Sequence, residues 1–304
     1  MASNRLNPDD ACFVVVGSVG RREALHASDL DLIPVLKTPE AHAEFKRHDQ
    51  AIREYVSSNL TIKVSKGADL TRCIDINTLT LPESIGGDSD DVSALTKRVL
   101  ILTEGIQAGG RLTLDAVRRK ILDAYAGAER TRGRHVLSLC NDVARYYRTL
   151  CIEYKAKVDT ESKDWCTRNM KLRHSRKLWY FATLLSMTAV ATRNPLGENA
   201  FTTDLLAEFD RPPITRLFRA IETNLSVRVA RILERFAWFL EFMASEKNRN
   251  ALASVEHSNR HEVSLENPFC AAKLNSDLMH REMVDLVEDL DGHLRERVFD
   301  WFLL

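Results

Sequence analysis

Two carboxylates stand two residues apart near the start of the chain, at Asp29 and Asp31. Residues 29–35 alternate loosely between polar and apolar side chains, and the two-residue period of a β-strand would place both aspartates on one face. Paired carboxylates suit a hard divalent cation such as Mg²⁺ or Mn²⁺, which takes oxygen ligands and often shares its coordination shell with substrate phosphates. The pattern therefore predicts a metal site at Asp29 and Asp31.

A turn that contains two glycines precedes these aspartates. The apolar, β-branched run of residues 13–16 predicts a buried strand that stops at Gly17 and Ser18. Because Gly17 and Gly20 lack side chains, backbone N–H groups can approach phosphate oxygens there, and the Ser18 hydroxyl and the Arg21 guanidinium can donate hydrogen bonds to them. The turn is therefore predicted to bind phosphate beside the metal.

The string from Gly17 to Asp31 resembles the signature of the nucleotidyltransferases with a DNA polymerase β-like palm, a Gly-Gly or Gly-Ser turn followed by Asp-x-Asp. Ten residues separate the Gly-Ser turn from the first aspartate. Arg21, Glu23 and Ser28 make the string similar to the bacterial branch that includes the nitrogen-regulator uridylyltransferases. The resemblance covers roughly the first third of the chain. It implies that Ser28 joins the nucleotide site and that a nucleoside monophosphate passes from a nucleoside triphosphate, such as ATP, to an acceptor with release of pyrophosphate.

The third metal carboxylate of this family lies on a later strand. The resemblance assigns that role, together with the role of catalytic base, to Asp75 within Cys73–Ile76. Asp69 is the alternative, but its surroundings, Gly67-Ala68-Asp69, are typical of a turn. Three carboxylates of this kind imply two metal ions, of which one activates the acceptor and the other binds the phosphates.

The sequence predicts an α+β fold in two domains. Residues 1–108 would form the polymerase β-like palm, a mixed sheet with helices. Helical periodicity begins at Val92, and no strand is expected after it, so residues 109–304 are predicted to form an all-helical domain that completes the nucleotide cleft. The expected elements of the palm are a helix over 39–59, strands over 60–64 and 72–79, and a loop over 82–91. Later elements are helices over 165–191 and 227–243, a loop over 245–262 and a last helix from 276.

Charge is balanced over the whole chain, with 43 basic and 43 acidic residues, so net charge alone does not indicate nucleic-acid binding. Residues 115–180, however, carry 16 basic and 8 acidic side chains. This local positive excess either contacts a triphosphate or an RNA backbone, or forms a solvated helix face. Both interpretations stay open at this point.

Arg168 and Arg173 are the basic residues that we predict to contact the nucleotide. Arg168, Asn169 and His174 also resemble the loose Arg-x4-6-His pattern of the HEPN ribonucleases, which are all-helical. Two alternatives to nucleotidyl transfer follow, namely metal-independent RNA cleavage in the helical domain and a catalytically silent protein that binds a nucleotide or a partner. The acceptor could be a protein, an RNA end or a small molecule, and protein or RNA is favoured.

The location of the protein is predicted from three observations. The six cysteines are scattered, which favours a reducing compartment. Residues 1–10 lack the apolar core of a signal peptide, and the longest apolar-leaning stretch, 178–191, is too short to span a bilayer. We therefore expect a cytoplasmic protein without a membrane partner.

Overall fold

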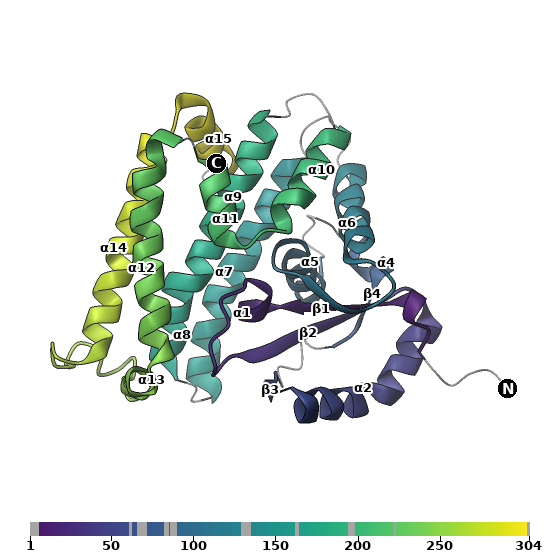
Figure 1. The fold of residues 1–304 in the computed structure, drawn as a ribbon, viewed down its shortest axis with the longest axis horizontal. Coiled ribbons are helices and arrows are strands. Elements are labelled where there is room, and N and C mark those ends of the chain that lie inside the picture. Colours follow the sequence, from purple (N-terminus) through teal and green to yellow (C-terminus); the bar gives the residue numbers. More distant parts are fainter. Residues whose placement is uncertain are drawn as a thin grey trace. The chain divides into compact units, whose positions relative to one another are not determined.

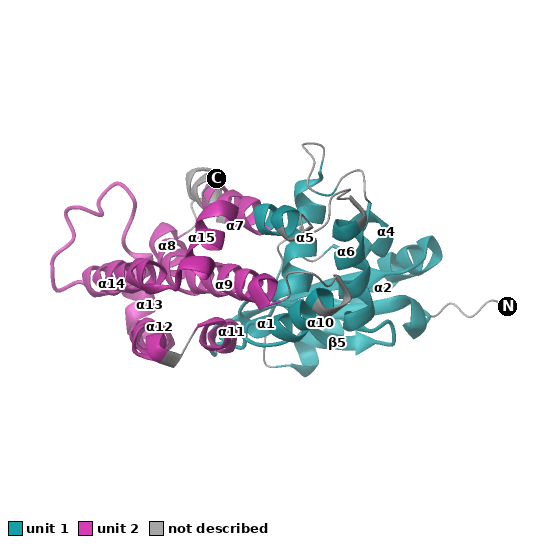
Figure 2. Ribbon diagram, turned by 90° about the horizontal axis from the view of Figure 1, so that it is seen from above, with its two compact units in different colours: residues 1–142, 194–212 teal, residues 143–193, 213–304 magenta. Residues whose placement is uncertain are grey.

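The computed structural model describes residues 6–60, 63–65, 72–81, 85, 90–128, 135–161, 164–193, 198–221 and 223–302. The chain divides into two compact units, shown in teal and magenta in Figure 2. Unit 1 comprises residues 1–142 and 194–212, and unit 2 comprises residues 143–193 and 213–304. Unit 1 contains a mixed sheet, and the regular elements described in unit 2 are helical, which confirms the predicted α+β class.

The sheet of unit 1 has five strands and is mixed. Figure 1 labels β1, β2, β3 and β4, and Figure 2 labels β5. The central pair is antiparallel, and its register sets Val16 opposite Asp31. The order is β3-β2-β1-β5, and β4 pairs with β2 beyond this path. Both β3 and β4 run parallel to β2, while β5 runs antiparallel to β1. The strands are β1 (Ala11–Val16), β2 (Asp29–Leu36), β3 (Lys63–Val64), β4 (Ile74–Asp75) and β5 (Ile106–Gly110).

The helix predicted over residues 39–59 is confirmed as α2 (Pro39–Asn59). It begins where the Thr38 side chain accepts a hydrogen bond from the Ala41 N–H, with a proline in its first turn. Phe45 is 2% exposed and packs with Leu36 in a small apolar cluster. Tyr55, predicted as a core residue, is 69% exposed, because the buried stripe of α2 is narrower than expected.

The other helices of unit 1 carry two corrections to the sequence prediction. The strand expected over residues 72–79 ends after Asp75, and the chain turns into a short helix at Ile76. A strand also follows Val92, because β5 pairs with β1, so the boundary predicted at residue 108 falls inside the sheet. The helices are α1 (Gly17–Gly20), α4 (Ile76–Leu79), α5 (Val92–Thr103), α6 (Leu114–Ala128), α10 (Glu198–Phe209), the 3-10 turn Pro8–Asp10 and the start of α7 (His135–Glu161).

Strand β5 was missed because its sequence, Ile-Gln-Ala-Gly-Gly, lacks the apolar alternation of a half-buried strand. Backbone pairing with β1 holds it instead. Gly110 shows why glycine stands there, since its φ is +84° and an added Cβ would lie 1.9 Å from the Ala11 carbonyl oxygen. The pair Gly109-Gly110 therefore lies in a strand at the edge of the sheet, where glycine allows a close approach to the backbone of β1.

Unit 2 is built from helices that match the predicted ones in position, with differences at their ends. The helix predicted over 165–191 is present, but a π-helical turn at Leu172–Arg176 interrupts it. The run 245–262, predicted as a loop, contains α13, and the last predicted helix begins earlier than residue 276. The elements are the rest of α7 from Val143, α8 (Trp165–Lys171), α9 (Lys177–Arg193), α11 (Pro213–Ala220), the 3-10 turn Thr223–Leu225, α12 (Ser226–Ala244), α13 (Glu246–Ala253), α14 (Pro268–Asp289) and α15 (Gly292–Phe302).

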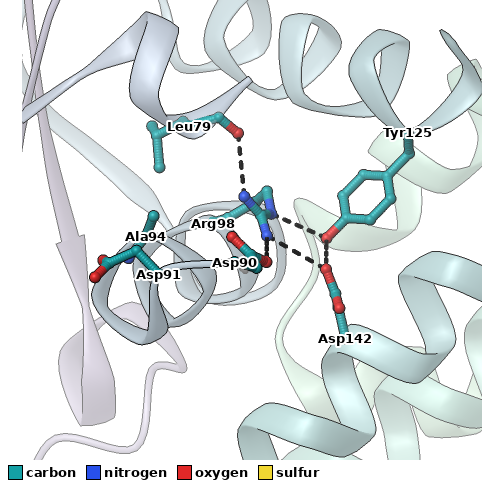
Figure 3. A network of polar contacts seen from close by, with 7 residues as sticks. All are labelled: Leu79, Asp90, Asp91, Ala94, Arg98, Tyr125 and Asp142. Atoms are coloured by element: carbon teal, nitrogen blue, oxygen red, sulfur yellow. Dashed lines mark hydrogen bonds and ion pairs between the residues drawn. The ribbon is translucent and has the colours of Figure 1, made fainter. Parts of the chain in front are cut away.

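A buried arginine, Arg98, connects several helices of unit 1 through ion pairs and hydrogen bonds (Figure 3). Arg98 of α5 forms ion pairs with Asp90 and Asp142. Its Nε donates to the Tyr125 hydroxyl at 3.0 Å, and that hydroxyl lies 2.6 Å from an Asp142 oxygen. Its Nη1 lies 3.4 Å from the Leu79 carbonyl oxygen at the end of α4. Buried charges of this kind are tolerated when each is paired and hydrogen-bonded, and here one side chain connects α4, α5, α6 and α7.

Candidate functional site

The predicted phosphate turn lies where β1 ends and the single-turn helix α1 begins. Gly17 has a φ of +73°, a conformation that favours glycine. A Cβ built on Gly17 would lie 2.3 Å from Oδ2 of Asp31, so the Asp31 carboxylate rests against the Gly17 backbone. The structure therefore brings together the glycine of the turn and one of the two predicted metal carboxylates.

The two aspartates belong to the first part of β2. Asp29 is exposed and Asp31 is half-buried, and the alternation of the strand puts both on one face, as predicted. Ser28 closes the turn before the strand, because its hydroxyl accepts a hydrogen bond from the Leu25 N–H at 2.9 Å. The two carboxylates thus extend from a strand that pairs with β1 and begins directly after a hydrogen-bonded turn.

The remaining turn residues differ in what they contact. Ser18 is half-buried, and its carbonyl oxygen accepts the Glu23 N–H at 2.8 Å. Gly20 packs so closely that an added Cβ would lie 2.4 Å from the Glu104 carbonyl oxygen. Gly20 therefore allows α1 to sit directly on the backbone at residue 104.

Arg21 is buried, 4% exposed, and contacts carboxylates of its own unit. Its Nε donates to Glu23 at 3.0 Å, and its Nη1 donates to Oε1 of Glu104 at 2.8 Å. The second oxygen of Glu104 accepts the Gly17 N–H at 2.9 Å. These contacts make Arg21 a support of the turn, and its predicted contact with phosphate stays a prediction.

The sequence prediction did not include Glu104. Its one local signal is a charged residue between the apolar end of α5 and Gly105, which by itself is typical of a helix end on the surface. Its neighbours at the site are more than eighty residues away in sequence, and strand pairing brings them together.

Asp75, the predicted third metal ligand and base, lies away from the aspartate pair. In the parallel register of β4 on β2, Asp75 stands opposite Leu36, five residues beyond Asp31. At about 3.3 Å per residue, that separation is roughly 16 Å along the strand. Its side chain instead caps α4, because Oδ1 accepts the Asn77 N–H at 2.7 Å. The structure therefore places Asp75 apart from Asp29 and Asp31, and the metal roles of these carboxylates stay predictions.

The alternative third carboxylate, Asp69, lies outside the described residues, as does most of the loop predicted over 82–91. Within the part of the chain that the structure describes, His, Cys, Asp and Glu side chains form no group of three or more that could hold a metal. Two carboxylates still fit one Mg²⁺, because this ion is usually held by one or two carboxylates together with substrate phosphates and water. The donor set at the site thus suits a single hard cation that a nucleotide completes.

The predicted site residues of the helical segment belong to unit 2. Arg168 of α8 is half-buried. Arg173 donates through Nε to the Ser276 hydroxyl at 2.7 Å and forms an ion pair with Asp277, so α14 holds it. Their contact with a nucleotide stays a prediction.

His174 is a core residue of unit 2. It is 0% exposed and stacks on Phe239 with ring centroids 4.0 Å apart. Its Nδ1 lies 2.9 Å from the Met170 carbonyl oxygen and its Nε2 lies 3.2 Å from the Asn275 amide nitrogen, which is the pattern of a neutral imidazole that donates from Nδ1 and accepts at Nε2. Burial lowers the pKa of His174 to about 4. The position that suggested a ribonuclease histidine is therefore filled by a packed, neutral side chain.

Comparison with known proteins gives a family match at the segment that holds this site. Residues 1–62 match the family described as "Putative nucleotidyltransferase DUF294". The match is consistent with the resemblance to polymerase β-like nucleotidyltransferases, while the bacterial branch stays a prediction. No curated protein and no solved structure gives a significant match. Among the helices described, none combines the length and the apolar character that crossing a bilayer requires.

Proposed function

We infer that this chain is a metal-dependent nucleotidyltransferase, which transfers a nucleoside monophosphate from a nucleoside triphosphate to an acceptor and releases pyrophosphate. One observation carries the proposal. The carboxylates of Asp29 and Asp31 lie on one face of β2, and that of Asp31 rests against Gly17 of the phosphate turn. These residues fall within the segment that matches a nucleotidyltransferase family.

Each part of the site has a proposed task. Asp29 and Asp31 would hold Mg²⁺ or Mn²⁺, which when bound neutralises phosphate charge and polarises the reacting phosphate. The Ser18 hydroxyl and the backbone at Gly20 would bind the phosphates, with Ser28 shaping the turn before β2. Gly17, whose N–H donates to Glu104, would instead give the phosphates room to approach because it has no side chain. The acceptor hydroxyl oxygen then forms a bond to the α-phosphorus as the bond to the leaving pyrophosphate breaks, and the proton of the hydroxyl passes to solvent water.

The acceptor is proposed from the charge of the chain. The positive excess over residues 115–180 suits an acceptor that carries phosphates, such as an RNA end, and also suits a protein with an acidic surface. Arg168 and Arg173 are the basic residues of this stretch that we propose to contact the nucleotide. The proposal for the acceptor does not depend on the metal site, and the labelling experiment described next tests both.

The test is incubation of the purified chain with each α-labelled nucleoside triphosphate, Mg²⁺ or Mn²⁺ and a cell extract, followed by separation of labelled protein, RNA and small molecules. Label in one of these fractions identifies base and acceptor together. Asp29→Asn and Asp31→Asn should each abolish labelling, because each removes a metal ligand. Asp75→Asn is the matched control, since asparagine caps a helix as well as aspartate does, and it should label at the wild-type rate.

Three results would change the assignment. Loss of labelling in Asp75→Asn would restore the three-carboxylate site. Full labelling in Asp29→Asn or Asp31→Asn would remove the metal assignment. Nucleotide binding without any transfer would favour the silent binding protein over the enzyme.

A further inference from the structure

We propose that Glu104 is a positioning residue of the nucleotide site, which fixes the glycine turn and, through it, the carboxylate of Asp31. That the turn belongs to a nucleotide site rests on the proposed function. The geometric part concerns the protein alone and can be tested without a nucleotide.

The carboxylate of Glu104 holds two parts of the turn at once. Oε2 accepts the Gly17 N–H at 2.9 Å and Oε1 accepts Nη1 of Arg21 at 2.8 Å. The side chain of Glu104 is fully buried, so both bonds lie away from water. Hydrogen bonds to an ionised carboxylate are shorter and stronger than neutral ones, and burial increases their strength further.

The segment that carries Glu104 is itself held rigidly. Gly105 follows it, and an added Cβ there would lie 2.6 Å from the Ile101 carbonyl oxygen and 2.8 Å from Cγ1 of Val14. Arg118 of α6 donates to the Ile101 carbonyl oxygen at 2.9 Å and to the Gly105 carbonyl oxygen at 2.7 Å. These contacts fix the backbone of the connection between α5 and β5, from which the Glu104 side chain extends.

Strand register explains why Glu104 reaches Gly17. In the antiparallel pair of β1 and β5, Val15 stands opposite Ile106. If this register is continued two residues beyond Val15, past the end of β1, and two residues before Ile106, it sets Gly17 opposite Glu104. Beyond the last backbone pair of β1 and β5, the Gly17 N–H therefore bonds to the side chain of Glu104 and not to a backbone carbonyl.

The consequence for the site passes through Gly17. The Asp31 carboxylate lies in contact with Gly17 at a distance that leaves no room for a Cβ. A shift of the turn would therefore move this carboxylate, and Mg²⁺ demands near-ideal ligand geometry. Functional groups need positions fixed to about 0.5 Å by supporting contacts, and Glu104 supplies such a contact.

The test compares hydrogen exchange at the Gly17 amide in the wild type, Glu104→Leu and Glu104→Gln, each measured relative to core amides of β1 in the same protein. Glu104→Leu removes the acceptor, and exchange at Gly17 should become about tenfold faster relative to the core, as a local opening. Glu104→Gln keeps one carbonyl acceptor and should give a smaller increase. Asp90→Asn is the matched control, because it disturbs a buried arginine pair elsewhere in unit 1, and its ratio should equal that of the wild type.

A second arm measures the affinity for a nucleoside triphosphate with Mg²⁺, which should fall about tenfold in Glu104→Leu, fall less in Glu104→Gln and stay unchanged in Asp90→Asn. Partial rescue by glutamine is the result that a purely structural role would not give. An unchanged Gly17 ratio in Glu104→Leu, or an equal change in Asp90→Asn, would overturn the role of Glu104. If Glu104→Leu does not fold, an unchanged ratio in Glu104→Gln overturns it. A wild type that binds no nucleotide, with the exchange differences present, would overturn the proposed function and leave the geometric role standing.

Discussion

Replacing Gly17 by alanine tests the site at its most restricted point. The backbone of Gly17 has a φ of +73°, and the added Cβ would lie 2.3 Å from Oδ2 of Asp31. Ordinary contact begins near 3.4 Å, so the carboxylate must move by about 1 Å or the turn must open. Gly17→Ala therefore strains the backbone and displaces a predicted metal ligand in one step.

The size of the effect follows from three contributions. A left-handed conformation costs an alanine about 1–2 kcal/mol. Forcing the Asp31 side chain off its rotamer costs about 0.5–1.5 kcal/mol. The reduced freedom of the unfolded chain offsets about 0.4–1 kcal/mol. The free energy of unfolding should therefore fall by about 2 kcal/mol, and transfer should fall by about 100-fold, as for a 1 Å misplacement of a reacting group.

Urea unfolding and the labelling assay measure the two effects. Gly109→Ala is the matched control in the same sheet, because its Cβ would meet Phe13 at 3.5 Å, an ordinary contact. It should unfold at or above the wild-type urea concentration and transfer nucleotide normally. A Gly17→Ala protein with wild-type stability and wild-type transfer would refute the close contact between Gly17 and Asp31.

Three further predictions concern the pH response, the core of unit 1 and ligand binding. The pKa of His174 is lowered to about 4 from an ordinary 6.5, so between these two pH values the unfolded chain binds a proton that the folded chain does not. The contribution of His174 to the free energy of unfolding, about 3 kcal/mol at full size, is therefore present above pH 6.5 and is lost progressively as pH falls from 6.5 to about 4. Urea unfolding at pH 7 and pH 4.5 should show a smaller loss in His174→Phe than in the wild type, and equal losses would contradict this. Tyr125→Phe should lower the free energy of unfolding by about 1–3 kcal/mol, because Arg98 and Asp142 lose a buried partner, whereas Tyr55→Phe, at an exposed residue, should leave it unchanged. A nucleoside triphosphate and Mg²⁺ together should raise the melting temperature more than either does alone, a synergy that Asp29→Asn should lose; purely additive shifts in the wild type would argue against a shared site.

Local sequence was sufficient where a structure depends on neighbours in the chain. The strand before Gly17, the helix at Pro39–Asn59 and the shared face of Asp29 and Asp31 each follow from periodicity, glycine and proline placement, or both. Periodicity also located most helices of unit 2. It did not reveal the helix at Glu246–Ala253, whose polar composition gives no clear buried stripe.

His174 shows the limit of a short motif. A histidine separated from an arginine by four to six residues has the same spacing whether it faces solvent or the core. The structure turns it inward, against Phe239 and Asn275, which belong to α12 and α14. Those neighbours are about 65 and 100 residues away in sequence, so no local pattern could show the burial.

The two differences at the candidate site have one physical origin, the register of strand pairs. Nothing in the sequence near Asp75 fixes which residue of β2 it meets, because a parallel pair is joined through a long connection rather than a tight turn. The structure sets it opposite Leu36, and that offset separates it from Asp31. By the same rule, the register of β5 on β1 carries Glu104 to Gly17. Strand register therefore places Asp75 away from the site and brings Glu104, which the sequence prediction lacked, to it. Unlike the aspartates of β2, Glu104 is buried and binds groups of the protein itself. A buried carboxylate that accepts a backbone N–H and an arginine is suited to hold a turn in place, whereas the partly open pair on β2 is suited to hold an ion.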